Sequence, residues 1–100
     1  MNNITPTSTE KIFTLINHFP CLRSKVKNWQ VKKFDPDSFL QIMTGASHGE
    51  HLCALFIVNV WNPAYAKTKG WDFDLMEFVG TCDLVSRTCL VAWVLNPVWP

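Results

Sequence analysis

The chain has 100 residues, of which 48% are hydrophobic, 13% aromatic and 17% charged, and its formal net charge is +1. This length fits one domain, and an apolar chain with so few charges is not intrinsically disordered. A net charge near zero also argues against an overall attraction to nucleic acid or to membranes. We therefore expect a single domain over residues 1–100.

The first predicted helix begins after Thr7 and ends before Pro20. The run Thr7-Ser8-Thr9-Glu10 is a capping box, in which the Thr7 and Glu10 side chains satisfy amide groups at the helix start. The apolar residues from Ile12 to Phe19 recur at helical spacing. Pro20 has no amide proton to continue the helix, so the helix is predicted to stop there.

Residues 21–33 form a basic stretch without clear periodicity, and a short helix, a short strand and an ordered loop all remain open for it. Lysine and arginine neutralise phosphates and tryptophan stacks on bases, so this stretch carries the best nucleic-acid signal in the chain. A solvated or protein-binding surface is the preferred interpretation. The candidate binding residues of this basic segment, residues 23–33, are Arg23, Lys25, Lys27, Trp29, Lys32 and Lys33.

Two helices are predicted between residues 35 and 61. Asp35 is a good N-cap and Pro36 suits the first helical position, so a short helix starts here. The run Ser47-His48-Gly49-Glu50 is a second capping box, and the residues after it are apolar nearly all round. This pattern predicts a central buried helix over about residues 48–61. A strand over Phe56–Trp61 is the alternative.

The remaining chain is predicted to hold a loop over residues 62–72, a helix over residues 74–82 and a last helix capped by Asp83. The fold class is therefore all-α, with four or five short helices around the helix at 48–61. Tyr65 and Trp71 lie in the predicted loop beside charged residues. Such aromatic residues often anchor protein interfaces, so we treat both as candidate interface residues.

Cysteine spacing and hydropathy indicate the cellular setting. Four cysteines, at positions 21, 53, 82 and 89, include no C-x-x-C pair, which argues against a zinc knuckle or a thioredoxin-type site. Residues 1–10 are polar and do not resemble a secretory signal. The apolar run Leu52–Trp61 is about half the length needed to span a bilayer. We expect a cytoplasmic protein with reduced thiols and no membrane span.

His48, Glu50 and His51 form the densest cluster of side chains suited to chemistry. Histidines three residues apart share a helix face and suit a metal ion or acid–base catalysis. The H-E-x-x-H pattern of zinc proteases is absent, however, and Glu50 is already explained as part of a capping box. We expect no catalytic residue, no metal and no cofactor. A small metal-dependent or acid–base enzyme at these three residues is our third choice of function.

Several short motifs together resemble a loose group of short bacterial proteins of unknown activity, found partly on plasmids and phages. The resemblance covers roughly residues 34–100 and implies a small accessory protein encoded by a mobile element. It implies no activity, cofactor or site. The motifs are Ser47-His48-Gly49-Glu50, Val60-Trp61-Asn62, Phe73-Asp74, Ala92-Trp93 and Asn96-Pro97-Val98-Trp99-Pro100.

These observations favour a small non-catalytic interaction or regulatory protein that binds another protein. An inhibitor of a host system, encoded by a mobile element, fits the small size and this context, and a nucleic-acid-binding accessory that uses residues 23–33 is the alternative. Charge is also unevenly distributed, because residues 1–33 hold six cations against Glu10 and residues 70–100 hold four acids against Arg87. A homodimer in which the basic segment meets the acidic end of a second copy is a further alternative.

Overall fold

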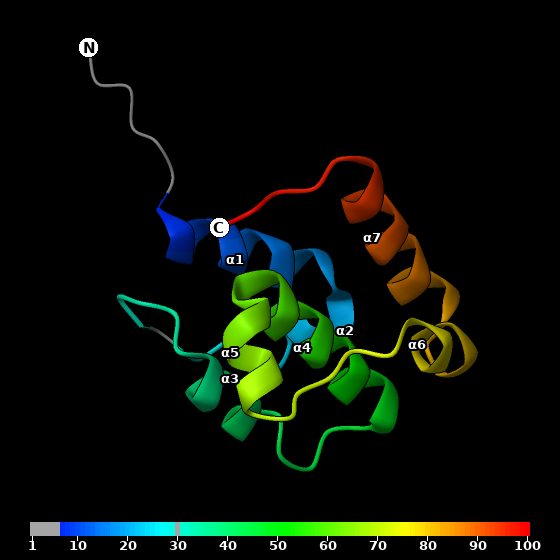
Figure 1. Cartoon of the computed structure of the whole chain (residues 1–100), viewed down its shortest axis with the longest axis horizontal. Coiled ribbons are helices and arrows are strands. Elements are labelled where there is room, and N and C mark those ends of the chain that lie inside the picture. Colours follow the sequence, from blue (N-terminus) through cyan, green and yellow to red (C-terminus); the bar gives the residue numbers. More distant parts are fainter. Residues whose placement is uncertain (1–6, 30) are drawn as a thin grey trace.

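The computed structural model describes residues 7–29 and 31–100. Over these residues it contains seven helices and no strand, which confirms the predicted all-α class (Figure 1). The helices are α1 (Ser8–His18), α2 (Pro20–Arg23), α3 (Pro36–Ile42), α4 (His48–Trp61), α5 (Pro63–Thr68), α6 (Leu75–Thr81) and α7 (Leu84–Leu95).

All but one of these helices begin at a residue whose side chain accepts a hydrogen bond from an amide of the first turn. Thr7 and Ser47 form the two predicted capping boxes with Glu10 and Glu50. Single side-chain caps start four more helices, at Asp35, Asn62, Asp74 and Asp83. Such a cap contributes about 0.5–2 kcal/mol, so local chemistry fixes most helix starts.

Two short helices add to the predicted number. α2 shows that residues 21–33 begin as a short helix, one of the three structures left open for this stretch. The described residues after Arg23 form turns and bends. α5 occupies part of residues 62–72, where a loop was predicted, and that prediction was wrong. Asn62 ends α4, but its side chain also accepts from the amide of Tyr65, and Pro63 sits at the first helical position.

α4 is the central helix, as predicted, and it packs against α1, α2, α3, α5 and α6 (Figure 1). Cys53, Ala54 and Ile57 on α4 have no exposed surface. Leu55 is only half-buried. The side chains that enclose α4 without any exposure are Ile16, Phe19, Leu22, Phe39, Ala66 and Phe78. No helix among the described residues has both the length and the apolar character that crossing a membrane requires.

α7 stands at the edge of the domain, shown in orange and red in Figure 1. Only Ser86 and Leu90 of this helix are buried. Residues 96–100 then run back from α7 towards α1 (Figure 1). Within this tail the Trp99 ring meets the Trp93 ring edge to face at 5.0 Å, yet Trp99 remains 58% exposed. α7 therefore adds little to the core and leaves much of its own surface in water.

Candidate functional site

The basic segment lies on the surface between α2 and α3 and is described except for Gln30. Its five cations, Arg23, Lys25, Lys27, Lys32 and Lys33, are all exposed. Within the described part of the chain, no carboxylate forms a salt bridge with any of them. The segment therefore presents unneutralised positive charge to solvent, and its role as a binding surface stays a prediction.

Trp29 has a structural role within this segment. It is half-buried, and its ring stacks on Phe39 at 6.0 Å with an interplanar angle of 27°. Phe34 meets the same ring edge to face at 6.0 Å, and Phe13 packs against it at 5.5 Å. Much of the surface that would stack on a base is therefore covered by the protein itself.

A groove of about 520 Å³ runs beside α2 and the start of the basic segment. Arg23 and Lys27 line this groove, whereas Lys25, Lys32 and Lys33 do not. The other lining residues are Phe13, Asn17, Pro20, Ser24, Val26 and Trp29. The structure thus brings two of the five predicted cations together at one concave surface, and two charges suit only a small anionic group.

Tyr65 and Trp71, the predicted interface aromatics, belong to one small network that joins α3 and α5. Their rings meet edge to face at 5.7 Å, and the Lys69 ammonium lies 5.9 Å and 5.5 Å from the two ring centres. Tyr65 donates a hydrogen bond to Asp37, and Lys69 forms a salt bridge with the same carboxylate at 3.1 Å. The Tyr65 hydrogen bond, aided by Lys69, lowers the pKa of Asp37.

In the cluster of His48, Glu50 and His51, Glu50 and His48 each make a contact with another part of the protein. Glu50 accepts from the Ser47 amide at 2.8 Å, and this hydrogen bond holds the pKa of Glu50 below its usual value. Nε2 of His48 lies 2.7 Å from a carboxylate oxygen of Glu77 on α6, and His51 is exposed. Within the described residues, no three metal-ligating side chains converge here or elsewhere.

Three cysteines that are far apart in the sequence meet beside the N-terminal half of α4. The Cys21 sulfur lies 4.0 Å from the Ser86 hydroxyl on α7. Interaction with the Cys53 thiol lowers the pKa of Cys21 to about 7, while the same interaction and burial raise the pKa of Cys53. Cys82 joins the group and donates to the Gly49 carbonyl at 3.5 Å. Sequence spacing gave no signal for this cluster.

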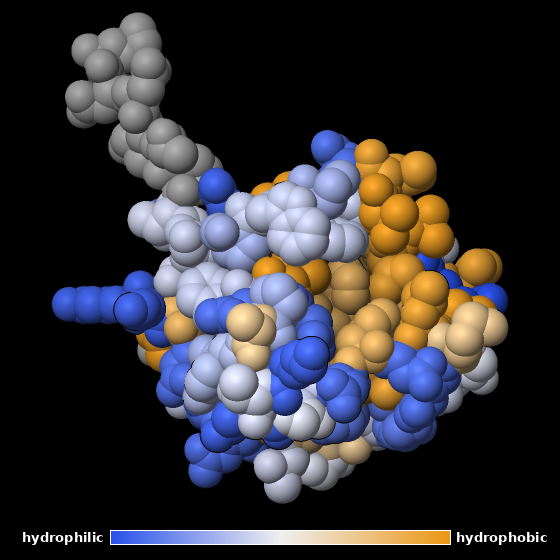
Figure 2. Space-filling model, in the orientation of Figure 1, coloured by the Kyte–Doolittle hydropathy of each residue, from blue (hydrophilic) through white to orange (hydrophobic). Residues whose placement is uncertain are grey.

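Among the described residues, ten of the eleven exposed large hydrophobic side chains lie on α6, α7 and the tail after α7. Figure 2 shows the α7 part of this surface as a continuous orange area. We call the surface the α6–α7 face, and it consists of Leu75, Met76, Val79, Leu84, Val85, Val91, Val94, Leu95, Val98 and Trp99. Each of these ten side chains exposes between 45% and 80% of its surface.

The prediction of the last helix rested on its Asp83 cap and did not indicate that most of the apolar residues on this helix face water. The signal was present in the composition, because Ser86, Arg87 and Thr88 are the only polar residues between Leu84 and Leu95. A helix at the edge of a small domain has neighbours on one side alone. It cannot bury apolar residues around its whole circumference, so one side must face water.

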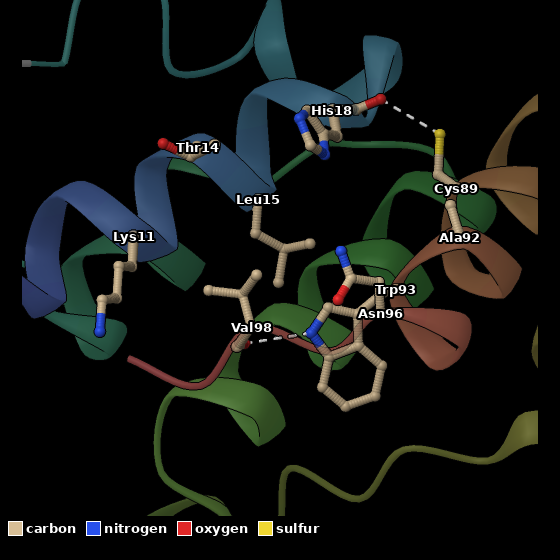
Figure 3. A pocket seen from close by; sticks show the side chains of 9 residues that line it. All are labelled: Lys11, Thr14, Leu15, His18, Cys89, Ala92, Trp93, Asn96 and Val98. Atoms are coloured by element: carbon tan, nitrogen blue, oxygen red, sulfur yellow. Dashed lines mark hydrogen bonds between the residues drawn. The ribbon is translucent and has the colours of Figure 1, made fainter. Parts of the chain in front are cut away.

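A pocket of about 480 Å³ separates α7 from α1 beside this face. Figure 3 shows Leu15 and Val98 pointing towards each other across it, with Lys11 at one end and His18 near the other. The Trp93 indole donates a hydrogen bond to the Val98 carbonyl at 3.2 Å and so holds the tail at the rim. The lining is completed by Thr14, Cys89, Ala92 and Asn96.

Comparison of the chain with protein-family models, with curated protein sequences and with solved structures gave no match. Inference about function therefore starts from the surfaces described above.

Proposed function

We propose that this domain is a non-catalytic protein-binding module and that the α6–α7 face is its binding surface. The observation that supports this most is the gathering of ten large, exposed apolar side chains on two consecutive helices and their tail. Inhibition of a host protein by such binding is a narrower form of the same proposal. A small domain exerts this kind of effect simply by covering a partner's surface.

The size of the α6–α7 face supports a binding role over chance exposure. At the exposed fractions observed, its side chains leave on the order of 1,000 Å² of apolar surface in water, against roughly 300–600 Å² for the largest patch on a typical monomer. Covering this area would release about 25 kcal/mol in gross hydrophobic free energy, of which association costs consume a large share. A domain that keeps such a face exposed is prone to association.

A photo-crosslinking experiment tests this proposal. A benzophenone amino acid is placed at Leu95 on the face, and a matched control carries it at Gln41, an exposed position on α3. We expect irradiation of intact cells to give discrete protein adducts from position 95 and none from position 41. If no discrete adduct forms from Leu84, Val91 or Leu95, the face is not a protein-binding surface.

A second candidate function, nucleic-acid binding, is favoured by one observation, the groove that Arg23 and Lys27 share with Phe13 and Trp29. Single-stranded nucleic acid binds where cations and aromatic rings alternate. Trp29 is largely engaged within the protein, however, and only two cations line the groove. These features support weak binding with few phosphate contacts.

Salt dependence of binding to a fluorescent single-stranded oligonucleotide tests this second function. Each phosphate contact contributes a slope of about −0.7 to the plot of log affinity against log salt. Contacts from Arg23 and Lys27 alone would give a slope of about −1.4. Reversal of both residues to Glu should abolish binding, while Lys32→Glu with Lys33→Glu, away from the groove, serves as the control. Equal loss in the two variants would contradict a groove-centred site.

A further inference from the structure

We propose that the partner of the α6–α7 face is a second copy of this chain, docked antiparallel along α7. This inference rests on the proposed function and names its partner. The outward side of α7 carries Leu84, Thr88, Val91 and Leu95, separated by four, three and four residues. This spacing is that of a seam between two packed helices. The exposed fractions of its apolar members are 69% for Leu84, 52% for Val91 and 80% for Leu95.

The near absence of charge on α7 indicates what kind of partner this helix can bind. Arg87 is the only charged residue of the helix, and its Nε reaches back to the Asp83 carbonyl at 3.4 Å. The seam itself therefore contains no charge between Leu84 and Leu95. A partner must offer an equally uncharged apolar strip over the ~16 Å that these residues span. The chain's own α7 is such a strip, and two copies would meet without opposing like charges.

The direction of docking follows from the acid that precedes α7. Asp83 caps α7, so it lies at the N-terminal end of the seam. A parallel pair would bring the Asp83 carboxylates of both copies together, which is unfavourable. An antiparallel pair separates them and places each acidic end near the partner's uncharged residues 96–100. It also sets the two helix dipoles in opposition, which is favourable.

The available area suits a stable dimer. Each partner in a standard protein interface buries about 800 Å², and the whole α6–α7 face, with α6 and the tail included beside the seam, exposes on the order of 1,000 Å². An antiparallel pair of α7 helices is related by a two-fold axis, so the same residues serve on both sides and the assembly closes at two copies. In this pairing Leu84 of each copy packs against Leu95 of the other.

Sedimentation of the purified full chain tests the inference, at concentrations from about 1 μM to 1 mM. We expect a species of twice the 11.5 kDa chain mass at the upper concentrations. Val91→Glu should raise the dissociation constant at least about 100-fold, because the buried charge enters the interface twice. Val31→Glu is the control, since Val31 is an exposed apolar residue in the basic segment, outside the face. A monomer at every concentration, or a dimer that Val91→Glu leaves intact, overturns the inference.

A charge pair tests the antiparallel direction. Leu95→Glu alone should weaken the dimer, and Leu84→Lys combined with Leu95→Glu should restore it, because the introduced ammonium of each copy then faces the introduced carboxylate of the other. Failure of this rescue contradicts the antiparallel alignment. If the purified chain stays monomeric while position 95 still yields adducts of a different mass in cells, this inference fails and the proposed function stands. If none of positions 84, 91 and 95 yields an adduct, the proposed function fails.

Discussion

The phenol of Tyr65 on α5 donates its hydrogen bond to the carboxylate of Asp37 on α3, across 28 residues of sequence. Lys69, the C-cap residue of α5, lies 3.1 Å from the other oxygen of the same carboxylate. The Asp37 carboxylate therefore binds both Tyr65 and Lys69. Asp37 and Lys69 are exposed and Tyr65 is half-buried. The contact fixes the position of the short helix α5 against α3, although neither helix is long enough to be stable alone.

Replacement of Tyr65 by Phe should lower the melting temperature slightly at neutral pH. The pKa of Asp37 is lowered by its partners, so its contribution to stability is present above its ordinary value of 3.8 and is lost as pH falls through its folded value. The hydrogen bond also raises the pKa of Tyr65 above 10.0, so the tyrosine contribution is lost at alkaline pH. The difference in melting temperature between the parent protein and Tyr65→Phe should therefore be largest near neutral pH. Thermal melts at several pH values measure it, and a pH-independent difference would show that the network does not form.

Cys21 should be the most reactive thiol of the chain near neutral pH. Its pKa of about 7 leaves a large fraction as thiolate there, whereas burial raises the pKa of Cys89. Alkylation by iodoacetamide, followed by peptide mass spectrometry, should show a rate at Cys21 that rises with pH and levels off above about 7. Cys53→Ala removes the thiol whose interaction lowers the pKa of Cys21, so it should move this rise to higher pH. Faster alkylation of the half-exposed Cys89 at pH 7 would contradict the assignment.

Ile57 and Leu55 offer a matched pair of truncations on α4. Ile57 has no exposed surface, so Ile57→Ala should cost about 2–5 kcal/mol of the roughly 5–15 kcal/mol that stabilises a domain of this kind. Leu55 is only half-buried, so Leu55→Ala should cost less. Denaturant unfolding of both variants measures the two free energies. An equal or larger loss for Leu55→Ala would mean that the exposed sides of α4 are wrongly placed.

Most helix starts could be predicted from sequence because capping chemistry is local. Thr7 and Ser47 each need only a carboxylate three residues later, and Asp35 needs only the proline that follows it. The Asn62-Pro63 pair misled the prediction because the same two residues that end one helix also start another. Local signals of this kind identify a boundary without saying what lies beyond it.

The candidate surfaces were harder to predict because they depend on the packing of distant segments. The cations of the basic segment are exposed as their charge requires, but sequence alone could not show that Trp29 turns inward onto Phe39. The meeting of Cys21 with Cys53 likewise depends on how α2 packs against α4. α7 carries apolar residues on all sides, so its sequence has no periodic pattern that distinguishes its buried side from its exposed side.

The shallow anchoring of α7, of which only Ser86 and Leu90 are buried, has a consequence for backbone motion. Segments with few buried contacts open at a lower free energy than the whole domain needs to unfold, and their amide hydrogens exchange correspondingly faster. Amides of α7 should therefore exchange with deuterium well before those of α4, whose Cys53, Ala54 and Ile57 are fully enclosed. Covering the outer side of α7 would slow exchange along that helix first, so amide protection there reports occupancy of the surface without any label on the partner.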